Sequence, residues 1–539
     1  MELSRRDLFK FGGVAAVGAA GAGMLAGCSP SGSSSKSSSS STSSSKTDDG
    51  LPSFFQAPDA ITDISETKDF DIVVIGAGAA GVPCALAAAE AGAKVALIQK
   101  ESQAVSQGNT CDSLEASNPK ASKAAVVSWV TEQCAWRSRR EQLELWANNS
   151  GEALHWLWDK ATEAGCQLVD TTKKWTSSIS TIDEQPVSYF AFDFGPKPYN
   201  TGSGMRDLCD YYNGKDGLEI FYSCPAQQLV KDGDKVTGVI CKNDQNKYVK
   251  FTASKGVVVA TGDYTNDDEM MAYYNPDCAH LDRKETNKTG DGQKMMVWAG
   301  GRMESVCGSK VQHDFDAGPG SMADMPFLTV KNDGTRFCNE NRSAMAYNGN
   351  FLTSEEDNGY YSQIFDSNYM TDCADWPGKL YDEEAIKAYM PEESGEKTAV
   401  YTDLIATYKA DTLEELGKKL GLTDVSAFVK TVNRYNELCE AGVDEDMGKP
   451  AKWLKAIKQP PFYGIHRHIR VSTIIHGVNV NGEMQVLDKD GKVIEGLYAI
   501  GNCAGNFFGS PDYPMDLPGL SLGRCHTQGY VVGNALAKK

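Results

Sequence analysis

The stretch DIVVIGAGAAG at residues 71–81 decides the fold. Residues 72–75 form a continuous β-branched run, which is typical of a parallel strand that is buried on both faces. Residues 76–81 then have the spacing G-x-G-x-x-G, an alanine-rich helical segment follows over 82–93, and residues 94–98 form a second strand-like run. This order of strand, turn, helix and strand predicts a dinucleotide-binding βαβ unit.

Each glycine of the turn has a physical role. Gly76 permits the tight turn, Gly78 lets backbone amides approach a pyrophosphate, and Gly81 allows the helix to pack closely on the strand. The diphosphate would lie at the helix N-terminus, beside Ala79 and Ala80, where free N–H groups and the helix dipole favour negative charge.

The end of the second strand is where an acidic residue usually binds the ribose hydroxyls. The sequence has Gln99-Lys100-Glu101 at this point. Gln99 can accept a hydrogen bond, although it lacks the charge of a carboxylate. We therefore predict that Gln99 lies on the ribose side of the cofactor, with Glu101 as the alternative.

The first residues form an export address rather than part of the fold. A twin arginine, Arg5-Arg6, precedes an apolar Gly/Ala-rich stretch over 11–26, which is shorter than the roughly 20 residues of a transmembrane helix. Residues 25–28 resemble a lipoprotein processing box in which Cys28 would be acylated; the alternative is a cleaved signal in which Cys28 has no role. We expect an extracytoplasmic protein, exported by the twin-arginine route and anchored to the cell membrane by lipid.

Composition and pattern divide the chain into five segments. Residues 1–28 are the expected signal, and 29–66 the expected disordered tether, because its serine-rich sequence buries too little apolar area to offset chain entropy. Residues 67–301 and 466–539 have strand character and complete one sheet, whereas 302–465 contains amphipathic helices and many aromatic residues. The predicted fold class is α/β, with a Rossmann-like domain interrupted by an inserted α+β capping domain.

The overall charge and the cysteines exclude some functions. With 53 Lys+Arg against 72 Asp+Glu, the formal net charge is −19, and binding to nucleic acid needs the opposite sign. The 15 cysteines include no C-x-x-C pair, so their spacing supports neither a metal site nor haem. An iron–sulfur cluster built from distant cysteines stays open.

A family resemblance rests on seven segments of the chain. They are 76–81, 107–110, 224–226, 260–262, 289–292, 334–340 and 496–505. Their order is similar to that in the flavoprotein family of soluble fumarate reductases, urocanate reductases and 3-ketosteroid dehydrogenases, and the likeness extends over roughly 68–539. It implies non-covalently bound FAD. One departure is Asp263, which replaces the second glycine of the family's A-T-G-G pattern.

The resemblance also implies where parts of FAD would lie. Gln99 would be near the adenosine, Ala226 on the adenine side, and Asp291 near the diphosphate. Asn109 and Thr110 would be near the isoalloxazine. The ribityl chain and flavin pyrimidine would contact Asn502, Ser521 and Leu522. Gly501 is a further candidate for cofactor binding.

The cap of this family supplies groups that polarise the substrate and deliver a proton. The resemblance implies His313 and His476 as candidate catalytic residues, although a lone histidine is more often a structural residue. Arg342 and Tyr347 are candidates for proton delivery. Tyr513 is similar to the tyrosine that polarises an enone carbonyl in ketosteroid dehydrogenases; the alternative is a turn residue packed on the flavin.

Two further positions bear on the substrate. Ala344 and Asp516 stand where fumarate reductases have their proton-donating and substrate-clamping arginines, so a dicarboxylate would lose bidentate partners. We expect an FAD-dependent reductase of an activated C=C bond in a small organic substrate: an aromatic acrylate, a urocanate-like acid, an enone, a steroid or a lactone, as in cardiac glycoside reductases. The alternatives are a flavin dehydrogenase that introduces unsaturation and a non-catalytic flavin- or substrate-binding lipoprotein.

The electron donor is expected to be another molecule. The sequence has one dinucleotide motif, and nicotinamide cofactors are scarce outside the cytoplasm. A membrane-anchored cytochrome c or a quinol-linked donor would then feed the enzyme in anaerobic respiration, and a lipid anchor would keep the two close together.

Overall fold

The computed structural model describes residues 51–175, 180–196, 198–305, 309–313, 325–341, 358–374, 390–391, 407–509 and 517–539. Every element named below lies in the unit that spans Lys46–Lys539.

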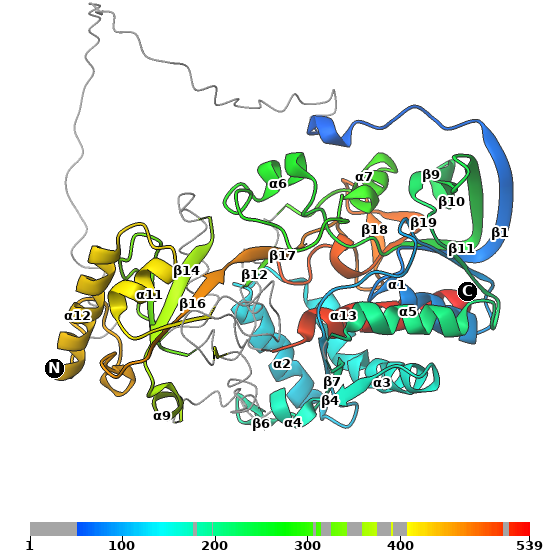
Figure 1. The fold of residues 1–539 in the computed structure, drawn as a ribbon. Coiled ribbons are helices and arrows are strands. Elements are labelled where there is room, and N and C mark those ends of the chain that lie inside the picture. Colours follow the sequence, from blue (N-terminus) through cyan, green and yellow to red (C-terminus); the bar gives the residue numbers. More distant parts are fainter. Residues whose placement is uncertain are drawn as a thin grey trace, which may run out of the picture. The chain divides into compact units, whose positions relative to one another are not determined.

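The predicted βαβ unit forms part of an eight-stranded sheet (Figure 1). Strand β1 (Ile64–Ile75) leads through helix α1 (Gly81–Glu90) to β2 (Val95–Ile98). β1 pairs in parallel with β2 and β11 (Tyr248–Val259), and β2 pairs in parallel with β8 (Leu218–Phe221). β19 (Val493–Ala499) adds to β11 in parallel, and β18 (Gln485–Leu487) pairs with β19 in the antiparallel sense. Both ends of the chain thus complete one sheet, as predicted.

Two hairpin strands and the last helix complete this part. β9 (Ala226–Asp232) and β10 (Lys235–Lys242) extend from β11 as an antiparallel pair. Helix α13 (Leu520–Ala537) packs on α1 through two glycines. A Cβ on Gly529 or Gly533 would stand 2.3 Å from a carbonyl oxygen of α1 or its N-cap, so small residues permit this contact.

A second sheet lies within the predicted segment 67–301. β3 (Thr110–Leu114), β7 (Tyr189–Phe194) and β4 (Leu168–Asp170) pair antiparallel. The same segment of the chain contains the helices α2 (Lys120–Gln133), α3 (Arg140–Glu163) and α5 (Thr201–Tyr212). The sequence patterns did not separate this sheet from the Rossmann-like one.

The inserted segment has a four-stranded antiparallel sheet of its own. Its order is β13 (Leu328–Val330), β14 (Tyr360–Phe365), β16 (Phe462–His468) and β15 (Thr407–Ala410), with helices α11 (Leu413–Lys419) and α12 (Val425–Ala441). β16 continues past the predicted boundary at 465, so this sheet ends three residues later. β12 (Ser309–His313) pairs with β17 (Arg470–Ile475).

Short elements fill the connections. They are the 3₁₀ turns Ser53–Phe55, Ala451–Trp453 and Gly501–Cys503, the strands β5 (Thr181–Ile182) and β6 (Gln185–Pro186), and the helices α4 (Thr172–Trp175), α6 (Asp268–Tyr274), α7 (Asp291–Trp298) and α9 (Tyr369–Cys373).

The packed chain begins before the predicted tether ends. Phe55 is 4% exposed and lies against Tyr274, with ring centroids 6.5 Å apart. The Ile61 N–H donates to Oε1 of Gln228, and β1 begins at Ile64. The predicted tether boundary at residue 66 is therefore too late. Phe54 and Phe55 supply apolar area that packs on the fold, and the serine-rich stretch lacks such area.

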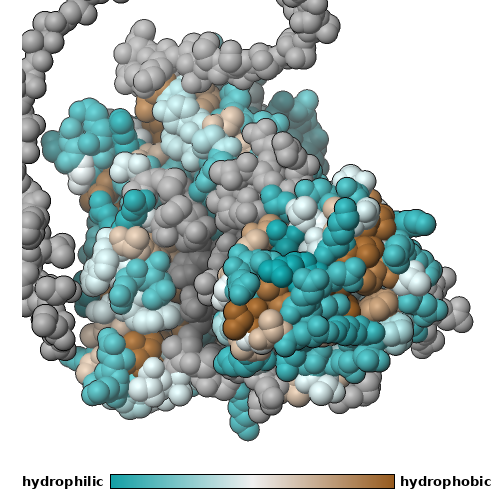
Figure 2. All heavy atoms as spheres, turned by 90° about the vertical axis from the view of Figure 1, so that its left-hand side faces the viewer, coloured by the Kyte–Doolittle hydropathy of each residue, from teal (hydrophilic) through white to brown (hydrophobic). Residues whose placement is uncertain are grey.

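On the face in Figure 2, the described residues are mainly hydrophilic, and hydrophobic residues form smaller groups among them. Large apolar side chains that are exposed come from separate elements, and scattered residues of this kind are ordinary; they are Trp136, Val169, Tyr273, Val443, Met447 and Val493. Within the described ranges, no helix has the length and apolar character to cross a membrane.

Candidate functional site

The glycine turn between β1 and α1 is closely packed against backbone. Gly76 has a φ of +108°, and a Cβ there would stand 2.4 Å from the carbonyl oxygen of Ala260. A Cβ on Gly81 would stand 1.8 Å from the carbonyl oxygen of Gly76. Helix α1 has no side-chain cap at Ala80. The N–H of Val82 donates to the carbonyl oxygen of Gly78 at 3.0 Å and Pro83 has no N–H, so the amides left for an anion are those of the turn before Val82.

A cavity of about 350 Å³ lies at this turn, by the carboxyl ends of β1, β2 and β11. Ligands of open α/β sheets bind at this edge. All residues predicted to bind the cofactor line the cavity except Gly81, which stands behind Gly76. The lining members are Gly76, Gly78, Ala79, Ala80, Gln99, Asn109, Thr110, Ala226, Asp291, Gly501, Asn502, Ser521 and Leu522. Their contacts with FAD stay a prediction.

The end of the cavity that is predicted to hold the adenosine is formed after β2. Oε1 of Gln99 accepts the N–H of Lys100 at 2.8 Å, so this oxygen is turned toward its own backbone. Nζ of Lys100 donates to Oγ1 of Thr289 at 2.7 Å and lies 3.0 Å from Oδ2 of Asp291. Sequence reasoning singled out Asp291 but not its partner Lys100, which also lines the cavity.

At the other end, helix α13 begins beside β3. Gly519 is its N-cap, with a φ of +86° and no side-chain cap. A Cβ on Gly519 would stand 3.0 Å from Cγ2 of Thr110. This close approach brings Ser521 and Leu522 to the same cavity as Thr110, although they are far apart in sequence.

Two buried polar atoms show that the wall suits a polar ligand. Oε1 of Gln107 and Oδ1 of Asn109 have no hydrogen-bond partner within the described structure, and both residues line the cavity. Nε2 of Gln107 donates to the Ser472 carbonyl at 2.8 Å. Buried acceptors of this kind normally find a donor, and a flavin offers an imide N–H and ribityl hydroxyls. Together with the open helix end, they fit a flavin dinucleotide.

Sequence reasoning missed an ion pair on the same wall. Nζ of Lys288 lies 3.3 Å from Oδ2 of Asp263, and both residues line the cavity. Asp263 drew notice only as a departure from a glycine pattern. The turn keeps its left-handed glycine, with Gly262 at a φ of +78°, so the substitution leaves the backbone turn in place and adds a buried carboxylate. No sequence signal marks Lys288 as its partner.

His476, predicted as catalytic, lies away from the cavity. It is fully buried and does not belong to the lining residues. Its Nδ1 is 2.6 Å from the hydroxyl of Tyr264, and its Nε2 is 3.3 Å from the carbonyl oxygen of Glu304. Both ring nitrogens of His476 are thus engaged in the interior, and its catalytic role stays a prediction.

The other predicted catalytic residues are not placed in detail. His313 is the last residue of β12 and pairs in register with Arg470, but its side chain is not described. Arg342, Tyr347 and Tyr513 lie outside the described residues, as do Ala344 and Asp516. Their catalytic roles stay predictions. Cys28, the predicted lipidation site, also lies outside them.

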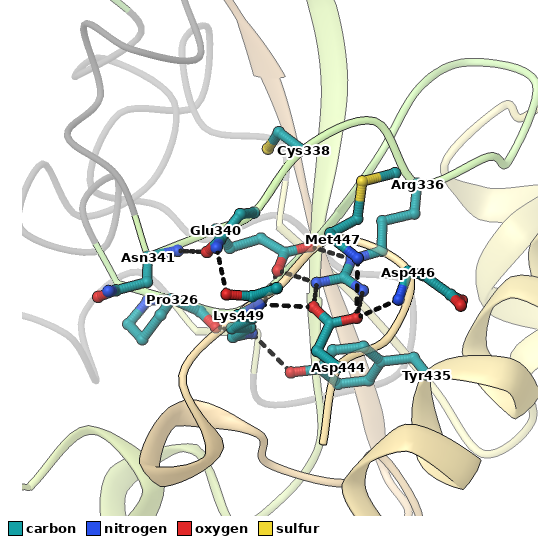
Figure 3. Close-up of polar contacts among 12 residues, drawn as sticks. Pro326, Arg336, Cys338, Glu340, Asn341, Tyr435, Asp444, Asp446, Met447 and Lys449 are labelled. Atoms are coloured by element: carbon teal, nitrogen blue, oxygen red, sulfur yellow. Dashed lines mark hydrogen bonds and ion pairs between the residues drawn. The ribbon is translucent and has the colours of Figure 1, made fainter. Parts of the chain in front are cut away.

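The motif 334–340 contributes to a buried charge network (Figure 3). Nε and Nη2 of Arg336 each donate to Glu340 at 2.8 Å. Nη1 and Nη2 also donate to Asp444, at 3.1 and 2.8 Å. Nζ of Lys449 lies 3.3 Å from Oε2 of Glu340 and donates to the Tyr435 hydroxyl at 2.6 Å. Two cations thus face two carboxylates, and neutral pairing of this kind makes burial of charge tolerable.

This network is structural in character. Glu340, Asp444 and Lys449 have fully buried side chains, and that of Arg336 is 8% exposed. None of them lines the cavity. The arginine of the motif therefore joins β13, the segment after it and the loop after α12, rather than facing a cofactor.

No group of histidine, cysteine and carboxylate side chains suited to a metal ion occurs among the residues that the structure describes. The cysteines whose side chains the structure describes are free thiols.

Comparisons with known proteins agree with this geometry. A family model described as "FAD binding domain" matches residues 71–510. The chain is 26% identical over 527 residues to a vinyl phenol reductase of Lactiplantibacillus plantarum, covering 88% of this chain and 98% of that protein. It is 24% identical over 580 residues to a digoxin reductase of Eggerthella lenta, covering 94% and 93%. The open conformation of a flavocytochrome c3 fumarate reductase has a similar fold, with a TM-score of 0.66, 23% identity and coverage of 88% of this chain and 79% of that chain. The family resemblance inferred from the motifs is confirmed.

Proposed function

The chain belongs to the FAD binding domain family, and on that premise we propose that it is a flavin-dependent reductase of an activated C=C bond in a small organic substrate. The observation that carries the proposal is the cavity, in which the glycine turn, Asn109 and the start of α13 meet. The vinyl phenol reductase and the digoxin reductase are similar to this chain along most of their length, and both are named for the reduction of an organic compound.

We favour a substrate that is not a small dicarboxylate. Ala344 and Asp516 occupy the positions at which the family's fumarate reductases have arginines, and both lack a cation. A dicarboxylate needs cationic partners of the bidentate kind to offset its desolvation. Aromatic acrylates, enones, steroids and lactones need fewer, and they form the preferred substrate class.

The family resemblance supports a division of the chemical tasks. Reduced FAD supplies the hydride when it is bound. The protein excludes water and holds the substrate alkene against the cofactor. This fixed orientation removes much of the entropic part of the activation barrier. We assign proton delivery to Arg342 or Tyr347 and carbonyl polarisation to Tyr513. Arg342 would need a neighbouring acid to restore its proton, since arginine rarely gives it up.

An anaerobic reoxidation assay tests the proposal. Purified flavin-loaded protein is reduced with a viologen dye and mixed with vinyl phenol, an aromatic acrylate, urocanate, a steroid enone, an unsaturated lactone or fumarate. Reoxidation by a compound other than fumarate, with one saturated product formed per flavin, supports the proposal. Reoxidation by fumarate alone contradicts our interpretation of Ala344 and Asp516.

The alternatives predict other results in the same assay. A dehydrogenase that introduces unsaturation would be reduced by a saturated ketosteroid and reoxidised by none of the alkenes. A flavin- or substrate-binding lipoprotein would bind compounds with no change in flavin absorbance.

We also propose that the protein works outside the cytoplasm, at the membrane, and receives electrons from a cytochrome c or a quinol-linked donor. The twin arginine and Cys28 support the location. Changing both Arg5 and Arg6 to lysine should leave the protein in the cytoplasm. Cys28→Ser should release it from the membrane fraction without lowering its flavin content; membrane retention of this variant would exclude a lipid anchor at Cys28.

A further inference from the structure

The ion pair of Asp263 and Lys288 is almost sealed from solvent. The side chain of Asp263 is fully buried, and that of Lys288 is 14% exposed. Oδ1 of Asp263 accepts the N–H of Thr265 at 2.9 Å, and Oδ2 accepts the hydroxyl of Thr473 in addition to facing Lys288. The ammonium also donates to the Ser472 carbonyl at 3.0 Å. Charges held in this way act through a medium of low dielectric constant.

The pair is connected to the residues assigned to the flavin. Nδ2 of Asn502 donates to Oγ1 of Thr473 at 2.8 Å, and Thr473 donates in turn to Asp263. Asn502 and Thr473 both line the cavity. The Oδ1 of Asn502 accepts from Nη2 of Arg524, a fully buried cation. A continuous hydrogen-bonded chain therefore runs from Arg524 to the ion pair along the cavity wall.

A second connection reaches the same end of the cavity. Gln107 and Lys288 donate to one acceptor, the carbonyl oxygen of Ser472, at 2.8 and 3.0 Å. Gln107 precedes Asn109 by two residues, and Asn109 has a buried oxygen without a partner. The ion pair is thus connected to the cavity wall by two routes, through Thr473 and through Ser472.

We propose that the Asp263–Lys288 pair sets the electrostatic potential at the flavin end of the cavity and thereby the reduction potential of the bound flavin. Lys288 is the cation that stabilises electron-rich reduced flavin, and Asp263 is the counter-ion that limits its effect. The proposal depends on the binding of FAD and not on the identity of the substrate.

This role predicts opposite effects for the two partners. Lys288→Gln removes the cation and leaves a buried carboxylate, which disfavours reduced flavin. Asp263→Asn removes the anion, keeps one oxygen as the acceptor for the N–H of Thr265, places an amide donor beside the Thr473 hydroxyl, and favours reduced flavin. The combined variant Asp263→Asn with Lys288→Gln restores the net charge and should return close to wild type. A purely structural ion pair gives no such reversal of sign.

The experiment is anaerobic equilibration of each flavin-loaded variant with a redox dye. We expect the ratio of reduced to oxidised flavin at a fixed dye potential to change on the order of tenfold in opposite directions, the size expected for one unit charge about 10 Å away at an effective dielectric constant of about 20. Lys489→Gln removes one exposed positive charge away from the cavity and is the matched control. It should leave the ratio unchanged.

Three results would overturn the proposal. The first is a shift of both single variants in the same direction, and the second is no shift in either. The third is loss of flavin from every variant, the double one included, which would mark the pair as structural. The alkene assay on wild type is separate, so a wrong substrate class cannot be mistaken for any of these results.

Discussion

In the turn after β1, the carbonyl oxygen of Gly76 stands 1.8 Å from the point that a Cβ on Gly81 would occupy. The first residue of α1 therefore has no room for any side chain. The carbonyl belongs to backbone that is itself fixed, because Gly76 packs on the Ala260 carbonyl. The spacing of the glycines is thus a packing requirement as well as a cofactor-binding one.

This relationship predicts that Gly81→Ala displaces the helix N-terminus from the cavity. We expect loss of bound flavin and a lower melting temperature, read from the flavin absorbance per protein and from thermal unfolding. Gly214→Ala is the control, since Gly214 has no atom within 4 Å of the added Cβ, although its own φ is +80°. It should cost only the roughly 1–2 kcal/mol of left-handed strain and keep its flavin. Full flavin content in Gly81→Ala would refute the packing argument.

Asn109→Ala should weaken flavin binding. The buried Oδ1 of Asn109 has no protein partner among the described residues, so a bound flavin is its expected donor. Loss of one hydrogen bond of about 1–1.5 kcal/mol corresponds to roughly a tenfold higher Kd. Titration of apoprotein with FAD, followed by fluorescence, measures the change. Asn534→Ala on α13 is the control, because its side chain bonds Tyr530 outside the cavity; equal effects of both variants would disprove the contact.

Arg336→Met should destabilise the protein strongly. It leaves the buried carboxylates of Glu340 and Asp444 with Lys449 as the remaining cation, and breaking such a network costs about 3–5 kcal/mol. Arg434→Met removes an arginine that also pairs with carboxylates but is 47% exposed, and should change the free energy of unfolding little, because solvent screens exposed ion pairs. Urea denaturation gives both values. Similar values for the two variants would mean that the network does not stabilise the fold.

The same network predicts a dependence on acid. Burial by itself would raise the pKa of Asp444. Hydrogen bonds from Arg336 and from the N–H groups of Lys449 and Met447 outweigh burial and lower this pKa from 3.8 to about 2. A lowered carboxyl pKa contributes stability that is present at neutral pH and is lost as pH falls through about 2. The free energy of unfolding of Asp444→Asn should therefore differ most from wild type near pH 6 and least near pH 2. A constant difference over this range would contradict the assignment.

Glu304 should have the opposite dependence. Burial raises its pKa to about 8, although its oxygens accept the N–H groups of Gly477 and Asn506. Because the folded pKa exceeds the ordinary value of 4.5, the stability it contributes is present below about pH 4.5 and declines as pH rises to 8. The advantage of wild type over Glu304→Gln in the free energy of unfolding should shrink between pH 5 and 8. Glu483→Gln, which removes an exposed carboxyl, should give a constant difference; a constant difference for Glu304→Gln as well would refute the prediction.

Much of the cofactor cavity could be predicted from sequence because its determinants are local. A β-branched run followed by glycines at fixed spacing forces a strand, a turn and a helix start at 71–81, whatever surrounds them. The carboxyl ends of β11 and β19 then meet at the same edge, which explains why Ala260 and Asn502 line the same cavity. Asn109 and Ala226 reach it from the starts of β3 and β9. The membership of the family follows from the same segments.

Features that depend on contacts between residues far apart in sequence could not be predicted. His476 lies in a contact with Tyr264, which is 212 positions away in sequence, and no periodicity marks that contact. The end of the cap sheet inside β16 depends on pairing with β14 and β15. The end of the tether depends on the tertiary contacts that bury Phe55.

The sequence by itself determined the dinucleotide-binding turn, the class of fold and the family, because these depend on backbone geometry that short motifs impose. Only the tertiary structure decided that Lys100 faces Asp291, that Lys288 faces Asp263, and that Arg336 is held between Glu340 and Asp444. A charge in a sequence has no fixed partner. Its effect depends on the distance to other charges and on the surrounding dielectric, and both arise only when the chain is folded.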